Sequence, residues 1–230
     1  MSSDTTSTDG TFEPGEFVEL EYTATAVESG LVIDTTDPSV AADADLADIE
    51  ADGPIVIVLG EGHVFEPVED ALATMGPDEH GTVQVAPADA FGEVDPTRRQ
   101  TVDIDVLGLE TVEQNDRVSV DGRVGYVDTV ADDTVTVDFN HPLAGATIEY
   151  DLKTGDRVEE LDGQVAGLLR LHGLGDDVSQ TIEEGVITCS VNQSSPPTDD
   201  WSDRKRQFLE SATAHLDVDV VRFEERYAIR

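Results

Sequence analysis

Residues 55–76 read IVIVLGEGHVFEPVEDALATMG, and this stretch holds the pattern that decides the fold. Its first five residues are uninterrupted and apolar, which is typical of a short buried strand. Further along, Pro67 is a helix-start signal and Gly76 a helix-stop signal. Between them, apolar residues recur at helical spacing: Val68, Ala71, Leu72 and Met75. The stretch therefore predicts a strand, a glycine-containing turn and one helix.

Three other segments alternate apolar and polar residues, as half-buried strands do: 16–26, 82–86 and 148–152. The alternation puts Tyr22 on the core-facing side of the strand predicted over 16–26. An acidic stretch without a base, 34–53, reads as a long solvated loop. The fold class that these patterns predict is α+β, with an antiparallel sheet wrapped on one helix. We expect residues 12–93 and 140–152 to form this domain.

Residues 94–139 carry a separate β pattern. Alternating apolar residues occur at Val102, Ile104 and Val106, and Val118 and Val120 lead into an Asp121-Gly122 turn. A last alternating run includes Val135, Val137 and Phe139. We expect a small β domain inserted into the first domain.

After residue 152 the pattern changes again. Helical spacing appears over 161–172 and 201–216, an apolar strand over 186–191, and a terminal strand over 218–229. This favours a C-terminal α/β domain over 153–230. At the other end of the chain, residues 1–11 are polar and are expected to be a disordered tail.

The composition limits the partners of this protein. There are 51 acidic residues against 13 basic ones, and the net charge is -38. Such a charge repels nucleic acid and anionic membranes. Disorder is the rival explanation of this composition, but the regular valine alternation argues against it. Because the first ten residues, MSSDTTSTDG, form no apolar leader and no long apolar run follows, we expect a cytoplasmic protein.

Cofactor and metal chemistry have little support in the sequence. Cys189 is the only cysteine, lies in an apolar strand, and is expected to be a buried core thiol. The histidines at 63, 80, 172 and 215 lack helical pairing, so we expect no metal site and no cofactor. The basic cluster at 204–206 is most simply a helix face that balances acidic neighbours.

Several short motifs follow one another in a fixed order along the first two thirds of the chain. Tyr22 is followed by Ile33-Asp34-Thr35-Thr36 and then by Val58-Leu59-Gly60-Glu61-Gly62-His63-Val64-Phe65. The turn Ala90-Phe91-Gly92-Glu93 and the segment Asn140-His141-Pro142-Leu143-Ala144-Gly145 complete the set. This ordered set resembles FKBP-type peptidyl-prolyl cis/trans isomerases of the SlyD-like kind. The resemblance covers about residues 16–152 and implies that 94–139 is a chaperone-like flap domain.

The resemblance also implies which residues act. Catalytic roles fall on Tyr22, Asp34, Phe65, Phe91 and Tyr150, where Asp34 orients Tyr22 and the amide of Phe65 holds a substrate carbonyl. Substrate-binding roles fall on Ile33, Ile55, Val64, Val68, His141 and Leu143. This chain departs from the family at Val68, where a larger side chain is common, and at Phe91, where the family has tyrosine. Aliphatic residues also replace phenylalanines near Ile33 and Ile55, and Glu66-Pro67 replaces Pro-Gly.

The implied partners are unfolded or nascent proline-containing polypeptides, without nucleic acid or membrane. A prolyl isomerase that also binds clients through its inserted domain is the first hypothesis. The alternative is a client-holding chaperone with little or no isomerase activity. A homodimer formed through the C-terminal domain stays open as a third, structural role.

The net charge predicts salt dependence. At molar ionic strength the Debye length is about 3 Å, so self-repulsion between surface carboxylates is screened. We therefore infer a salt-adapted cytoplasm, as in haloarchaea, and expect the melting temperature and the activity to fall when KCl is diluted from molar to physiological concentration. A melting curve that does not move over this range would contradict the inference.

Overall fold

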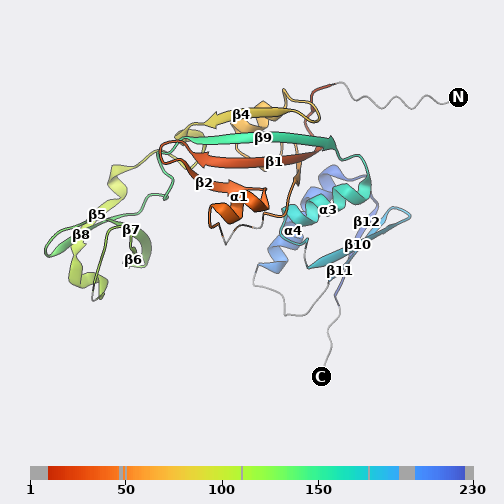
Figure 1. Ribbon diagram of the computed structural model, residues 1–230. Coiled ribbons are helices and arrows are strands. Elements are labelled where there is room, and N and C mark those ends of the chain that lie inside the picture. Colours follow the sequence, from red (N-terminus) through yellow and green to blue (C-terminus); the bar gives the residue numbers. More distant parts are fainter. Residues whose placement is uncertain are drawn as a thin grey trace. The chain divides into compact units, whose positions relative to one another are not determined.

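The computed structural model describes residues 10–46, 49, 51–109, 111–175, 177–191 and 200–225 (Figure 1). The chain divides into two compact units. The first is drawn from 1–25, 30–84 and 149–230, and the second from 26–29 and 85–148.

A five-stranded sheet organises the first unit, counted over the described residues. Its main path runs β2-β1-β9-β4, and β3 pairs antiparallel with the first half of β1 (Figure 1). The strands are β1 Phe17–Ala26, β2 Leu31–Thr35, β3 Ile55–Val58, β4 His80–Val85 and β9 Ile148–Arg157. The alternation read from the sequence is present, because Leu20 and Ala24 of β1 are fully buried on one face. This agrees with the expected α+β class.

Helix α2, Glu66–Leu72, follows β3 as the sequence predicts. Phe65 occupies its N-cap with extended backbone, and Glu66 and Glu69 place negative charge in the first turn, where the helix dipole favours it. Val68 and Leu72 are fully buried. The helix is shorter than its apolar pattern, since turn-type hydrogen bonds hold Thr74 and Met75 after it ends.

The acidic stretch over 34–53 contains structure that the sequence reading missed. Helix α1 spans Pro38–Asp43, and the Asp37 carboxylate accepts hydrogen bonds from the backbone N–H groups of Ser39 and Val40. An aspartate N-cap followed by proline at the first helical turn is a strong start signal. The high acidity concealed that signal, because it is also typical of a solvated loop.

The second unit contains a four-stranded sheet in the order β5-β8-β7-β6, counted over the described residues. The strands are β5 Arg99–Asp103, β6 Arg117–Val120, β7 Arg123–Val130 and β8 Thr134–Asp138. The predicted Asp121-Gly122 turn joins β6 to β7, with both residues at positive φ. The strand expected to continue through Ile104 and Val106 ends earlier. Those residues form a 3-10 helix, η3 Ile104–Leu107, closed by Gly108 at φ 63°.

Two shorter 3-10 helices precede this sheet. They are η1 Pro87–Asp89 and η2 Pro96–Arg98.

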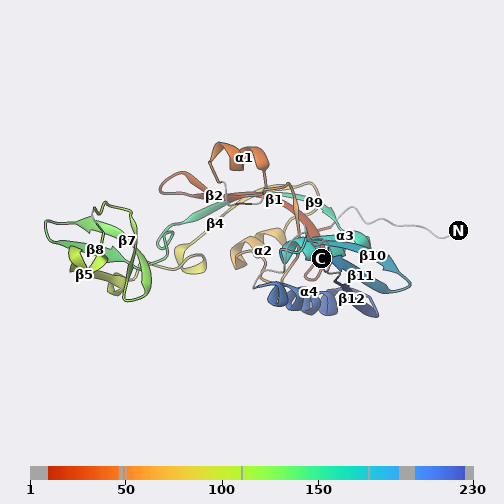
Figure 2. The ribbon, with the colours of Figure 1, turned by 90° about the horizontal axis from the view of Figure 1, so that it is seen from below.

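The C-terminal part of the chain combines two helices and a three-stranded sheet within the described residues (Figures 1 and 2). The helices are α3 Leu161–Leu171 and α4 Trp201–His215, and the strands are β10 Val178–Glu183, β11 Val186–Val191 and β12 Val220–Glu224. β12 runs parallel to β11, and β10 forms an antiparallel hairpin with β11. The sequence reading missed β10. The expected terminal strand is present as β12, which ends at Glu224, and the residues Tyr227 and Ile229 of that expectation lie outside the described residues.

Residues 153–230 share one compact unit with the β1-containing sheet. Strand β9 runs through the boundary expected after residue 152 and ends at Arg157. One hydrophobic core joins Phe17 and Val58 of the sheet to side chains of α3, α4 and β11. The close approach is visible at Gly167 of α3, where an added Cβ would lie 2.6 Å from the Cβ of Val56. Only glycine fits there without displacing the strand.

Three smaller expectations can be compared with the structure. The tail was expected to reach residue 11, but the carbonyls of Gly10 and Thr11 accept hydrogen bonds from Arg157, and residues 1–9 lie outside the described residues. Cys189 is fully buried, and burial raises the pKa of its thiol to about 11, as fits a core residue. Among the described residues, no helix is long and apolar enough to cross a membrane.

Candidate functional site

Tyr22 and Asp34 form the polar centre of the predicted site. The Tyr22 hydroxyl donates a 2.7 Å hydrogen bond to Oδ2 of Asp34, which joins β1 to β2. Both side chains are partly buried. Burial is the main reason that the pKa of Tyr22 lies well above its usual range, and the hydrogen bond and negative charge of Asp34 raise it further. Tyr22 is therefore a protonated donor.

Two more aromatic rings stand against this pair. The ring of Tyr150 from β9 lies 5.6 Å from that of Tyr22, centroid to centroid, and 6.2 Å from that of Phe65 in an edge-on arrangement. Burial, and then the charge of Asp34, raises the pKa of Tyr150 to about 12. Strands β1 and β9 and the start of α2 thus bring three predicted rings together, with Asp34 beside two of them.

Two threonines hold the backbone of Tyr22 in place, and the sequence reading gave them no role. The N–H of Tyr22 donates to Oγ1 of Thr36 at 2.9 Å, and its carbonyl accepts from Oγ1 of Thr35 at 3.1 Å. Both threonines are almost fully buried. Buried hydroxyls need partners, so these bonds fix β1 against the end of β2. The signal was present in Asp34-Thr35-Thr36, where two hydroxyl residues follow the acid.

The aliphatic residues predicted for substrate binding occupy the same unit. Ile33, Ile55 and Val64 are partly buried, whereas Val68 has no exposed surface. Ile55 pairs with Leu20 of β1 and so lies on the face of the sheet that carries Tyr22.

The remaining predicted residues belong to the second unit. The rings of Phe91 and His141 stack with centroids 4.5 Å apart and planes 2° from parallel. Nδ1 of His141 accepts the N–H of Leu143 at 3.2 Å, which fixes the exposed imidazole over the phenyl ring. Leu143 is partly buried.

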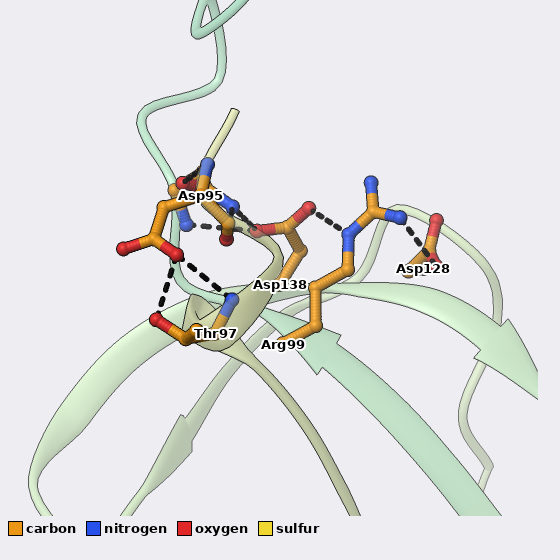
Figure 3. Close-up of polar contacts among 6 residues, drawn as sticks. Asp95, Thr97, Arg99, Asp128 and Asp138 are labelled. Carbon is orange, nitrogen blue, oxygen red and sulfur yellow. Dashed lines mark hydrogen bonds and ion pairs between the residues drawn. The ribbon is translucent and has the colours of Figure 1, made fainter. Parts of the chain in front are cut away.

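Asn140 ties the two connections of the four-stranded sheet to each other. Its side chain accepts from the N–H of Asp95 and donates to the carbonyl of Asp95, both at 3.0 Å. The Asp138 carboxylate accepts from Asn140 and, at 2.8 Å, from Nε of Arg99 (Figure 3). Partial burial alone would raise the pKa of Asp138, but these hydrogen bonds outweigh it and lower that pKa. Asp95 also accepts from Thr97, so the connections are braced on both sides (Figure 3).

A cavity of about 330 Å³ opens beside this network. Its wall mixes the polar groups of Arg99, Asp138 and His141 with Val94 and Tyr126. Within the described residues, no group of three or more His, Cys, Asp or Glu side chains is arranged to hold a metal ion.

Comparison with known proteins identifies the family. The model of the FKBP-type peptidyl-prolyl cis-trans isomerase family matches residues 9–107. A short-type peptidyl-prolyl cis-trans isomerase of Methanocaldococcus jannaschii is 30% identical over 145 residues, which are 62% of this chain and 91% of that protein. The chain belongs to the FKBP-type peptidyl-prolyl cis-trans isomerase family. This confirms the predicted enzyme class, EC 5.2.1.8.

SlyD-type relatives of this FKBP-type chain match a similar share of it. The SlyD isomerase of Treponema pallidum is 31% identical over 66% of this chain and 81% of its own length. The SlyD isomerase of Aeromonas hydrophila is 28% identical over 70% of this chain and 71% of its own length. About a third of the chain lies outside each match, so the role of the remainder has to be argued from its own residues.

The tyrosine environment gives a test by pH titration. Replacing Asp34 by Asn removes a negative charge that disfavours both phenolates, so the pKa values of Tyr22 and Tyr150 should both fall. Stability should also change, because Tyr150 titrates near 10 when unfolded and near 12 when folded. The raised pKa of Tyr150 therefore stabilises the folded state fully below pH 10, and this stabilisation is lost as the pH rises toward 12. Asp34→Asn should reduce this alkaline loss.

Tyrosine side-chain NMR shifts followed against pH make the measurement. Asp37→Asn is the matched control, since Asn caps a helix about as well as Asp and Asp37 is not a cause of either tyrosine shift. Unchanged tyrosine titration in Asp34→Asn would show that the carboxylate does not act on the rings.

Proposed function

We propose that this FKBP-type chain catalyses cis/trans isomerisation of X-Pro bonds at a site built around Tyr22, Asp34, Phe65 and Tyr150. The observation that carries the proposal is the meeting of three aromatic rings and one carboxylate from separate elements, in a chain of the isomerase family. In this proposal Ile33, Ile55, Val64 and Val68 supply aliphatic surface for the proline ring. The resemblance also assigns a catalytic role to Phe91 and substrate-binding roles to His141 and Leu143, and those roles stay predictions.

The chemistry requires no nucleophile and no proton transfer. Rotation of the X-Pro bond has a barrier of about 18 to 20 kcal/mol because the amide has partial double-bond character. An apolar surface that excludes water favours the twisted amide, whose carbonyl is less polarised than in the planar form. Aromatic side chains provide such a surface. Tyr22 and Tyr150 stay protonated because their pKa values are raised, so they offer O–H dipoles without adding charge.

The departures from the family pattern affect efficiency more than they affect the type of reaction. Phe91 lacks the hydroxyl that the family's tyrosine offers, and Val68 is smaller than the usual floor residue. Such losses would disable an acid–base mechanism, whereas apolar replacement at a hydrophobic surface is tolerated. A client-holding chaperone with little isomerase activity is the alternative, and these two positions favour it.

Proline-limited refolding in molar KCl separates the two functions. At substoichiometric amounts the wild type should accelerate the slow phase, and Tyr22→Ala and Asp34→Ala should each lose most of this rate because the polar centre is broken. Tyr22→Phe keeps the ring and tests the hydroxyl without risk to folding. Asp43→Ala is the control, because it removes an exposed carboxylate at the end of α1.

If the wild type fails to accelerate refolding but still prevents client aggregation, the chaperone alternative replaces the isomerase proposal.

We also propose that residues 94–139 act as an inserted, chaperone-like client-binding domain. Exposed apolar surface is concentrated there, since six of the ten large, exposed hydrophobic side chains among the described residues lie in this segment: Val94, Val106, Leu109, Val124, Tyr126 and Val130. Val124 and Tyr126 lie on the exposed face of β7, since Gly125 and Val127 between and beside them are buried, and neighbouring exposed apolar side chains are typical of surfaces that bind other proteins. The 330 Å³ cavity, with Val94 and Tyr126 in its wall, adds a recess to this surface. The partners would be unfolded or nascent proline-containing polypeptides.

A double substitution tests client binding. Leu109→Ser with Val124→Ser should weaken suppression of client aggregation on the order of tenfold, because two half-exposed side chains lose their apolar contacts. Isomerisation of a short proline peptide should be unchanged. Leu209→Ser with Val220→Ser is the matched control, since it removes one leucine and one valine of lower exposure outside the segment. Equal loss in both double variants would contradict the assignment.

The setting of this function follows from the charge. We infer a salt-adapted cytoplasm of a halophilic archaeon, because a net charge of -38 is best tolerated where salt screens it. The same charge disfavours nucleic acid and anionic membrane as partners. The C-terminal α/β segment shares its core with the β1-containing sheet, and a homodimer formed through it stays the structural alternative. Light scattering of the full chain in molar KCl would exclude the dimer if the mass is that of a monomer.

A further inference from the structure

The C-terminal helix ends beside the loop that leads into the proposed prolyl site. His215 is the last residue of α4, and its Nε2 lies 3.5 Å from Oε1 of Glu61 in that loop. The imidazole also packs edge-on against Phe17 at the start of β1, with ring centroids 6.4 Å apart and planes at 84°. The side chain of His215 is only 13% exposed, and Phe17 is buried. A single residue therefore contacts both the sheet and the loop.

The loop, residues 59–65, contacts neighbouring elements at several points. Gly60 and Gly62 turn the backbone at positive φ, which glycine adopts readily. The N–H of Gly62 donates to Oε1 of Glu69 at 2.8 Å, a bond from α2. Oε1 of Glu61 lies 3.5 Å from Nε2 of His215. The loop ends with Val64 and Phe65, and the Phe65 ring stands edge-on to Tyr150.

We propose that His215 is a positioning residue for isomerisation, which binds Glu61 and so fixes the loop that places Val64 and Phe65. This inference rests on the proposed function of the aromatic site. The imidazole packs against Phe17, which belongs to the core that joins the C-terminal segment to the sheet, while its Nε2 lies 3.5 Å from the Glu61 carboxylate. Reaction rates are sensitive to displacements of about 1 Å, so a loop held at one more point has a direct effect on catalysis.

Other ionisable groups lie around this contact. His63 belongs to the loop, Glu69 to α2 and Glu210 to α4, and His172 caps the end of α3. Glu69 acts electrostatically on His63, and His63 and Glu210 act on His172. Burial, which is the largest cause, lowers the pKa of His63 and of His172. The proposal for His215 depends on the contact and not on titration, so all variants are compared at one pH.

The experiment uses substitutions that separate packing from binding to Glu61. His215→Leu keeps apolar bulk against Phe17 but removes the donor, and Glu61→Gln weakens the acceptor. Each should reduce kcat/KM for a proline peptide several-fold, mainly through kcat. The double variant should be no worse than the worse single variant, because both changes break one contact. His215→Gln, which keeps a side-chain donor, should recover much of the activity.

Ser211→Ala is the matched control. It removes the 2.9 Å hydrogen bond between His172 and Ser211, which links α4 to the residue after α3 and leaves Glu61 and His215 unchanged. Its activity should equal that of the wild type. If Ser211→Ala is as impaired as His215→Leu, or if His215→Gln recovers nothing, His215 serves only the packing of the C-terminal segment and the proposal fails.

Amide NMR shifts of Val64 and Phe65 give a readout that does not depend on activity. Relative to the wild type, both amide shifts should change in His215→Leu and in Glu61→Gln and should be unchanged in Ser211→Ala. An inactive wild type would overturn the proposed function, yet these shifts would still show whether His215 positions the loop. Unmoved shifts in both loop-contact variants would overturn the positioning role even if the enzyme is active.

Discussion

Burial of strand β3 on both faces is the constraint on which the rest of the first unit depends. Ile57 lies on the side of the sheet where Val18 and Leu20 are buried, and Val58 on the other side joins Phe17 in the core shared with α3 and α4. Isoleucine and valine side chains alternate on its two faces, so a one-residue slip in register would exchange the two sets and force both faces to repack. Its end therefore places the loop over 59–65 at a fixed point. From that point the chain turns into α2 with Phe65 as the N-cap.

Two of the few basic side chains, Arg157 and Lys153, lie where segments distant in sequence meet. Arg157 binds Glu16 and the carbonyls of Gly10 and Thr11, so it fastens the start of the chain to the end of β9. Lys153 pairs with Glu21 of β1. Exposed pairs of this kind contribute little energy individually, about 0 to 1 kcal/mol. In a chain with 51 acidic residues, these pairs mainly reduce the repulsion between carboxylates at the places where the segments meet.

Sequence reasoning was accurate where the pattern is local and failed where tertiary contact decides. The strand β1 and the helix start marked by Pro67 could be predicted, because an apolar period of two residues indicates a strand and a period of 3.6 residues indicates a helix. Tyr22 and Asp34 could be proposed as partners only through the family resemblance, since no local pattern joins residues on two strands. The missed elements have specific causes. α1 was concealed by acidity, and β10 has few apolar residues because β11 supplies most of the shared core.

The C-terminal segment shows best why sequence alone was insufficient. Its helices and β11 were readable, and their apolar faces suggested either an independent domain or a dimer contact. The sequence did not show which surface these elements cover. The unbroken apolar run Ile55-Val56-Ile57-Val58 was nevertheless a signal that both faces of β3 are covered. Gly167 of α3 lies on the opposite side of this contact with β3, because any larger residue there would hold the helix away from Val56. Because that packing sets the position of α4, the segment most distant in sequence from the polar centre is in contact, through His215, with the loop that carries Phe65.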